Sequence, residues 1–170
     1  SQYNFGMSIG TTIYGLFNFK EGKNIQSIRH VIRPSINYNI RPSFEKYYDT
    51  YIVDADGNTA EYTRFEDSFF GRPSKNYSSN IGINISNNLE AKVASKDSLS
   101  TEPKKIKILN NLNFSTSYNL AADSLRLAPI RMTAGSTIFD NKLNINIGAT
   151  FDPYSINDNG SRIDKLNISN

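Results

Sequence analysis

Hydrophobic and polar residues alternate with a period of two over much of this chain. From Tyr3 onward every second residue is mainly apolar, and the residues between them are mainly Asn, Gly, Ser and Thr, with Tyr14 and Leu16 as exceptions. A helix would distribute these side chains around its circumference, whereas a β-strand places them on one face. The pattern therefore predicts a strand over residues 3–19 with one apolar and one polar side.

The same alternation recurs along the rest of the chain. Further runs occupy residues 28–41, 77–93, 105–122, 130–139 and 142–152, and a last run starts near Asp164. One side of these runs is rich in Ile and aromatic residues, and the other is rich in Asn. The sequence predicts about seven strands, several of them about 14–18 residues long, whereas strands of globular proteins are usually about 5–6 residues long.

The bulk composition is polar, yet it is compatible with a membrane protein. The chain has 170 residues, of which 38% are hydrophobic, and a mean hydropathy of -0.49. No run approaches the roughly 18 apolar residues of a transmembrane helix. Membrane β-barrels do not need such a run, because alternating strands keep an apolar face at a polar average composition. We therefore expect an all-β chain: a portion of an antiparallel transmembrane β-barrel, with residues 1–170 in a single domain.

The links between the expected strands differ greatly in length. In chain order they are residues 20–27, 43–76, 94–104, 123–129, 140–141 and 153–163. Antiparallel strands assign successive links to opposite ends of the sheet, so the long link 43–76 and the tight Asp140-Asn141 turn lie at opposite ends. Outer-membrane barrels have short periplasmic turns and longer extracellular loops. We therefore interpret 43–76 as an extracellular loop.

Aromatic residues gather near both ends of the expected strands. Those near the extracellular ends are Tyr3, Phe5, Tyr38, Tyr77, Tyr118, Phe151 and Tyr154. Those near the periplasmic ends are Phe17, Phe19 and Phe139. Aromatic side chains concentrate at the two membrane interfaces of such barrels, and these residues are predicted to form the aromatic girdles.

Five segments resemble the barrel domain of the LptD family of lipopolysaccharide-assembly proteins, in the form found in Bacteroidetes-type bacteria. They are TTIYGLFNF (11–19), IRHVIRPSINYNIRPSF (28–44), NNLEAKV (87–93), NFSTSYNLAADSLRLAPI (113–130) and KLNINIGATFDPYSINDNG (142–160). The resemblance implies a protein of the bacterial outer membrane that passes lipopolysaccharide into the outer leaflet and is not an enzyme. The expected partners are membrane lipid and lipopolysaccharide, together with an LptE-like plug lipoprotein and periplasmic bridge proteins, which the resemblance implies. This chain would be an internal or C-terminal-side portion of a larger barrel.

Cationic residues recur on the polar side of the expected strands. They are Arg29, Arg33, Arg41, Lys92, Lys105 and Lys107. Arginine pairs with phosphate in a bidentate geometry, so these side chains are candidates for binding lipopolysaccharide phosphate in the lumen. The competing interpretation, which we favour here, is that they pair with acidic side chains on neighbouring strands or on a plug.

Three further features indicate structure rather than chemistry. His30, the one histidine, lies on the apolar side, where the alternation supplies no partner for catalysis or metal binding, and an interfacial position is expected. Residues 54–58 are similar to a calcium-binding loop but lack its later acidic ligand, and Asp56-Gly57 favours a hairpin turn instead. Pro34 removes a ladder donor inside a strand and predicts a bulge or bend. The family resemblance implies that prolines can loosen strands beside a lateral opening.

The remaining motifs narrow the function classes. Asp97-Ser98-Leu99 and Asp123-Ser124-Leu125 are similar to the O-glycosylation pattern of Bacteroidetes-type bacteria. No catalytic, zinc, phosphate-loop or dinucleotide motif occurs, so no enzyme, cofactor or metal is expected. Scattered Lys and Arg at a net charge of +3 do not indicate nucleic acid. Two other classes remain open: a porin or TonB-dependent importer barrel that passes solutes, and a soluble β-rich binding protein.

Overall fold

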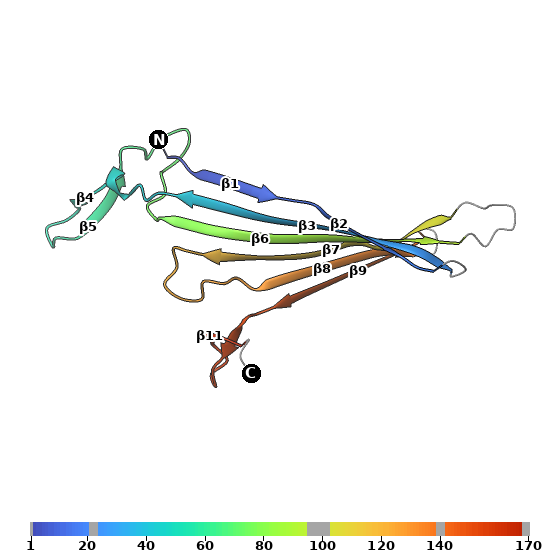
Figure 1. The fold of residues 1–170 in the computed structure, drawn as a ribbon. Coiled ribbons are helices and arrows are strands. Elements are labelled where there is room, and N and C mark those ends of the chain that lie inside the picture. Colours follow the sequence, from blue (N-terminus) through green and yellow to red (C-terminus); the bar gives the residue numbers. More distant parts are fainter. Residues whose placement is uncertain (1, 21–23, 95–102, 139–141, 168–170) are drawn as a thin grey trace.

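The chain forms one long antiparallel sheet with two small hairpins attached (Figure 1). The computed structural model describes residues 2–20, 24–94, 103–138 and 142–167. Seven strands make up the main sheet: β1 (Phe5–Gly10), β2 (Ile13–Asn18), β3 (Ile25–Arg41), β6 (Ser78–Val93), β7 (Lys104–Asn119), β8 (Ile130–Ile138) and β9 (Leu143–Phe151). Both β1 and β2 pair with β3, and the order continues β3-β6-β7-β8-β9.

The two hairpins lie at the same end of the sheet (Figure 1). One consists of β4 (Tyr48–Ile52) and β5 (Thr59–Thr63), preceded by the short 3-10 helix Glu45–Tyr47, and it belongs to the long link between β3 and β6. The other consists of β10 (Tyr154–Ile156) and β11 (Arg162–Leu166). We call this end of the sheet the loop end and the opposite end the far end. The expected all-β antiparallel fold and the long link are confirmed.

The strand register converts the sequence alternation into two chemically different faces. Directly opposed residues point to the same side of a sheet. Ile9, Ile36 and Ile83 form one such row across β1, β3 and β6. One residue along the chain, Ser35 lies opposite Asn84 on the other face. The sheet therefore has an apolar face and a polar face.

The first expected strand is interrupted, and Pro34 explains why. The backbone N–H of Thr11 donates to the carbonyl oxygen of Pro34 over 3.1 Å, between β1 and β2. In a hydrogen-bonded antiparallel pair the return bond would come from the nitrogen of the partner, and proline has no N–H. The expected bend or bulge thus takes the form of a break in the neighbouring strand, at Thr11–Thr12.

The last expected strand does not join the main sheet. Residues near Asp164 form β11, which pairs with β10. Tyr154 of β10 is only 6% exposed, and its hydroxyl accepts a hydrogen bond from the backbone of Leu127 over 2.8 Å. Asp164 accepts another from the backbone of Leu125 over 3.0 Å. These contacts hold the hairpin against the link between β7 and β8.

Nothing in the described part of the chain covers the apolar face. Its side chains remain open, with Ile9 65%, Ile36 54% and Ile147 58% exposed. Full burial of one such side chain would stabilise the protein by about 1.5–3 kcal/mol relative to leaving the side chain in water. No helix among the described residues is long and apolar enough to cross a membrane. The apolar face is therefore an exposed surface of the described residues.

Candidate functional site

The polar face carries a cluster of cationic side chains near its far end. The register places Arg29 of β3 opposite Glu90 of β6, and Glu90 opposite Lys107 of β7. Lys92 and Lys105 lie directly opposite each other two residues further along. The structure thus brings together the candidates from three strands that are far apart in the sequence.

Two of these side chains have partners within the sheet. The Arg29 guanidinium donates to the Glu90 carboxylate at 2.7 Å, with the two side chains 55% and 29% exposed. The Arg33 guanidinium donates to the amide oxygen of Asn88 at 2.5 Å. An ion pair exposed to this degree contributes only about 0–1 kcal/mol. Glu90 therefore orients Arg29 and neutralises only part of the cluster.

The Lys92–Lys105 pair is the part of the cluster that the sheet itself does not neutralise. Within the described residues, no ion pair involves Lys92, Lys105 or Lys107. Like charges opposed on one face destabilise a sheet. A hollow of about 270 Å³ lies beside the pair and is lined by Asn18, Ser27 and Arg29 among others. This arrangement suits an anionic group that bridges the two ammonium groups.

A smaller hollow lies next to the first, on the same polar face. Its volume is about 190 Å³, and its lining includes Arg29, Arg33, Glu90 and Lys107. Arg29 and Glu90 line both hollows. The far end of the polar face therefore offers two adjacent recesses with cationic walls.

Arg41 does not belong to this cluster. It lies opposite Ser78 at the loop end, a full strand length away from Lys92 and Lys105. Its Nε is buried and has no hydrogen-bond partner among the residues that the structure describes. The structure therefore separates Arg41 from the other five cationic candidates.

The aromatic candidates that the structure describes lie toward the two ends of the strands, with Tyr154 as the exception. Tyr3, Phe5, Tyr38, Tyr77, Tyr118 and Phe151 lie at or near the loop end, and Phe17 and Phe19 lie near the far end. Several are widely exposed, such as Phe5 at 59% and Phe17 at 60%. Tyr154 differs because it is buried in the β10–β11 hairpin. Phe139 and the Asp140-Asn141 turn lie outside the described residues.

His30 has a partner that the alternation does not reveal. Its Nε2 lies 3.1 Å from the amide oxygen of Asn87 on β6. Asn87 is 8% exposed and occupies a position on the apolar face, where the pattern would place an aliphatic residue. This partner is an amide and not a catalytic or metal-binding group, and the sequence signal that could have found it is the break in alternation at Asn87.

Residues 54–58 form the turn of the β4–β5 hairpin, as the Asp-Gly pair predicts. The Asp54 carboxylate accepts hydrogen bonds from the backbone N–H groups of Asp56 and Asn58 and from the Asn58 side chain. The Asn58 side-chain bond, followed by its backbone bond, lowers the pKa of Asp54 below its ordinary value. Gly57 adopts a φ of 83°, a conformation that glycine adopts readily. Within the described ranges, no three His, Cys, Asp or Glu side chains gather into a metal-binding group.

The two Asp-Ser-Leu triplets fall in links. Asp97-Ser98-Leu99 lies outside the described residues. Asp123-Ser124-Leu125 lies in the link between β7 and β8, where Leu125 has a φ of 50°. The backbone N–H of Leu125 is held by Asp164, so the second triplet is anchored to the β10–β11 hairpin.

Long antiparallel strands with one uncovered apolar face and one cationic polar face define an amphipathic sheet. The family model described as LptD protein matches residues 1–154. Because the match covers most of the chain, the chain belongs to the LptD protein family. Membership associates it with lipopolysaccharide transport and with transport and assembly proteins of the outer membrane rather than enzymes. Comparisons with curated proteins and with solved structures gave no match.

Proposed function

We propose that this chain is part of a transmembrane β-barrel of the bacterial outer membrane that transports lipopolysaccharide and inserts it into the outer leaflet. The observation that carries the proposal is the uncovered apolar face of a long antiparallel sheet in an LptD-family chain. Lipid satisfies such a face, and a polar lumen suits the opposite face. The membrane-spanning barrel, the insertion step and the partners are all parts of this proposal.

The length of the central strands supports a membrane crossing. β3 has 17 residues, and β6 and β7 have 16 each. The apolar row of β3 runs from Ile28 to Ile40. At about 3.4 Å per residue and a tilt of about 45°, this row spans about 29 Å, enough to cross the roughly 25 Å apolar band of membrane barrels. The strands extend beyond this band at both ends.

The polar face supports a path for an anionic saccharide. We assign the loop end to the cell exterior, because the longest link of outer-membrane barrels is extracellular. The cationic cluster then lies near the periplasmic entrance, where Lys92, Lys105 and Arg29 meet incoming cargo. Phosphate groups on lipopolysaccharide would bridge the two opposed lysines. Arg41 would lie near the exit.

An LptE-like plug lipoprotein and periplasmic bridge proteins complete the proposal as partners. A plug would enter the same polar lumen, and its acidic side chains would compete with phosphate for the cationic cluster. The two occupants predict different outcomes when the lysines are neutralised. Loss of phosphate contacts slows transport while the plug stays bound, whereas loss of plug contacts reduces the amount of plug recovered with the barrel.

The test is complementation of a depletion strain with the full-length protein that contains this chain. Depletion should reduce surface lipopolysaccharide, and the double variant Lys92→Gln/Lys105→Gln should restore it only in part. Lys165→Gln, an exposed cation of β11, is the matched control and should restore it fully. The amount of folded protein and of plug in the outer membrane is measured in parallel. Normal surface lipopolysaccharide after depletion would overturn the transport function and favour a porin or importer.

A further inference from the structure

The link between β5 and β6 contains an exposed aromatic segment that the transport path does not use. We call residues 65–73 the aromatic loop. Phe69 is 96% exposed and Phe70 is 85% exposed, and their rings meet edge to face with centroids 5.3 Å apart. Two bulky apolar side chains in water are each less stable by about 1.5–3 kcal/mol than when buried. Such a pair therefore favours contact with an apolar partner.

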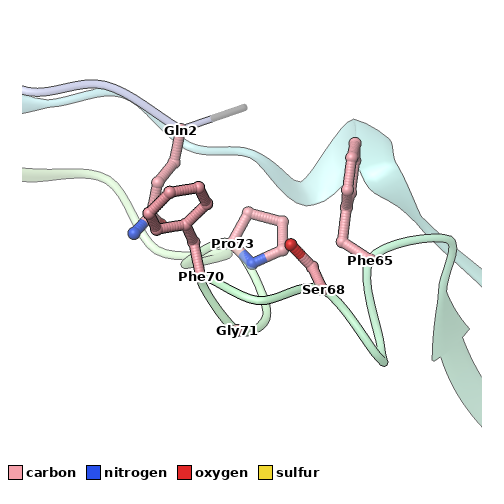
Figure 2. A pocket seen from close by; sticks show the side chains of 6 residues that line it. All are labelled: Gln2, Phe65, Ser68, Phe70, Gly71 and Pro73. Carbon is pink, nitrogen blue, oxygen red and sulfur yellow. The ribbon is translucent and has the colours of Figure 1, made fainter.

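A pocket of about 570 Å³ opens beside the Phe70 ring (Figure 2). Its walls come from the aromatic loop and from the start of the chain, and they are Gln2, Phe65, Ser68, Phe70, Gly71 and Pro73. None of these side chains is charged. The volume falls within the range of about 300–1,000 Å³ that is usual for small-molecule sites. The pocket thus suits an apolar chain rather than an ion or a saccharide.

Hydrogen bonds hold the aromatic loop and its flanks in place. The Gln2 side-chain oxygen accepts a bond from the Ser74 N–H at 3.1 Å, and the Tyr48 hydroxyl donates to the Pro73 carbonyl at 2.5 Å. Arg72 forms an ion pair with Glu66 across the base of the loop. The exposure of Phe69 and Phe70 is therefore built into a loop that is tied down on both sides.

A chain of ring contacts connects the pocket to the apolar face of the sheet. The ring centroids of Phe65 and Tyr47 are 5.3 Å apart, those of Tyr47 and Phe44 are 6.1 Å apart, and those of Phe44 and Tyr3 are 5.4 Å apart. Tyr3 precedes Phe5 by two residues and so continues the apolar row of β1. Phe44 is only 2% exposed, so these rings pack as a small aromatic core that anchors the aromatic loop at the loop end of the face that we assign to lipid.

We propose that the aromatic loop binds membrane lipid of the outer leaflet, with one acyl chain in the Phe65–Phe70–Pro73 pocket and the Phe69 and Phe70 rings at the membrane surface. The inference rests on the proposed function, because it takes the apolar face as lipid-facing and the loop end as external. The ring packing and the Gln2–Ser74 hydrogen bond fix the loop beside the loop end of that face, where the face would meet the membrane surface, and this position selects lipid over a soluble protein partner. Aromatic rings are well suited to this depth, where one edge is wet and the other apolar.

The experiment places a photo-crosslinking phenylalanine analogue, benzoylphenylalanine, at single positions of the full-length protein in its native membrane. Positions Phe69 and Phe70 test the aromatic loop. Tyr62 of β5, which is 42% exposed on the neighbouring hairpin, is the matched control outside the pocket. Ile83 in the middle of the apolar face tests the membrane crossing itself. Adducts are identified by mass spectrometry.

We expect lipid adducts at positions 69, 70 and 83 and several-fold fewer at position 62. Lipid adducts at 83 but not at 69 or 70 would overturn the loop inference and leave the barrel intact. Protein adducts at 69 and 70 would also overturn the loop inference, because they would assign the loop to a protein partner. Absence of lipid adducts at 83 would instead overturn the membrane crossing. A second experiment places the analogue at Phe65 and compares the native loop with the double variant Phe69→Ser/Phe70→Ser. The double variant should abolish the lipid adducts formed at position 65.

Discussion

The amide group of Asn87 links His30 on one neighbouring strand to the backbone of Leu112 on the other. Its oxygen lies 3.1 Å from the imidazole Nε2, and its nitrogen donates to the Leu112 carbonyl over 3.0 Å. The β6–β7 register shifts just beyond this point, between Asn87 and Leu89. The Asn87 side chain, on the apolar face, thus donates a hydrogen bond to the Leu112 carbonyl oxygen beside the register shift of the β6–β7 ladder.

Removing this amide should destabilise the sheet. Asn87→Ala leaves the Leu112 carbonyl and the His30 ring without their shared partner, and a buried polar group left unsatisfied costs about 1–3 kcal/mol. We expect a loss of that size in denaturant unfolding of the full-length protein in detergent. Asn84→Ala, an exposed asparagine of the same strand, should change the unfolding midpoint little. Equal effects of the two variants would show that the Asn87 bonds contribute nothing specific.

Restoring the donor at Pro34 should strengthen the pairing of β3 with the segment between β1 and β2. Pro34→Ala supplies an N–H to the Thr11 carbonyl, and a hydrogen bond of this kind contributes about 0.5–1.5 kcal/mol. Amide exchange of residues 10–13, measured by mass spectrometry, should slow, while exchange within β6 and β7 stays constant. Ser35→Ala is the control, because it keeps the existing backbone bonds. Unchanged exchange in Pro34→Ala would mean that the break at Thr11–Thr12 has another cause.

The Lys92–Lys105 pair should show opposite effects on stability and on transport. Lys105→Glu replaces a like-charge pair by an opposite-charge pair, and cross-strand pairs of this kind contribute about 0.2–1 kcal/mol. The unfolding midpoint should therefore rise while surface lipopolysaccharide falls. Lys165→Glu should lower neither quantity. A stabilised variant that transports normally would exclude the lysine pair from the path of the cargo.

The β4–β5 turn should open in acid. The Asn58 hydrogen bonds lower the pKa of Asp54 below 3.8, its ordinary value, so the folded turn favours the ionised carboxylate. The stabilisation is complete above that pH and is lost as the pH falls through the lowered pKa. Spin labels at Ile52 and Thr59, which lie opposite each other, should give a narrow distance distribution at neutral pH that broadens in acid. Asp54→Asn removes the titration and should make the distribution independent of pH in this range.

The sequence predicts most of the strand architecture because the alternation is strong and local. The bounds of β3, β6 and β9 fall within a few residues of the expected runs. The break between β1 and β2 could not be placed, because it arises from Pro34 on another strand and only the register shows which residue loses its donor. The β10–β11 hairpin could not be predicted for a similar reason, because Tyr154 and Asp164 are held by contacts with a link that is distant in sequence.

The candidate site was predictable in kind but not in arrangement. Alternation places Arg29, Lys92 and Lys105 on the polar face, and the structure keeps them there. The pairing of Arg29 with Glu90 depends on the β3–β6 register, and the opposition of the two lysines depends on the β6–β7 register and its shift near Leu89. No local pattern encodes either register. The aromatic loop was described in the sequence only as part of a long link, because its exposure and its pocket follow from how that link folds.

The β4–β5 turn has a practical consequence for locating this chain in a cell. Gly57 lies at the tip of a hairpin with an exposed turn, and an added Cβ there would meet no atom within 4 Å. Exposed loop tips of this kind tolerate inserted residues. A short epitope placed after Gly57 would thus reach antibodies on intact cells without disturbing the sheet, and its labelling would report which side of the membrane the loop faces.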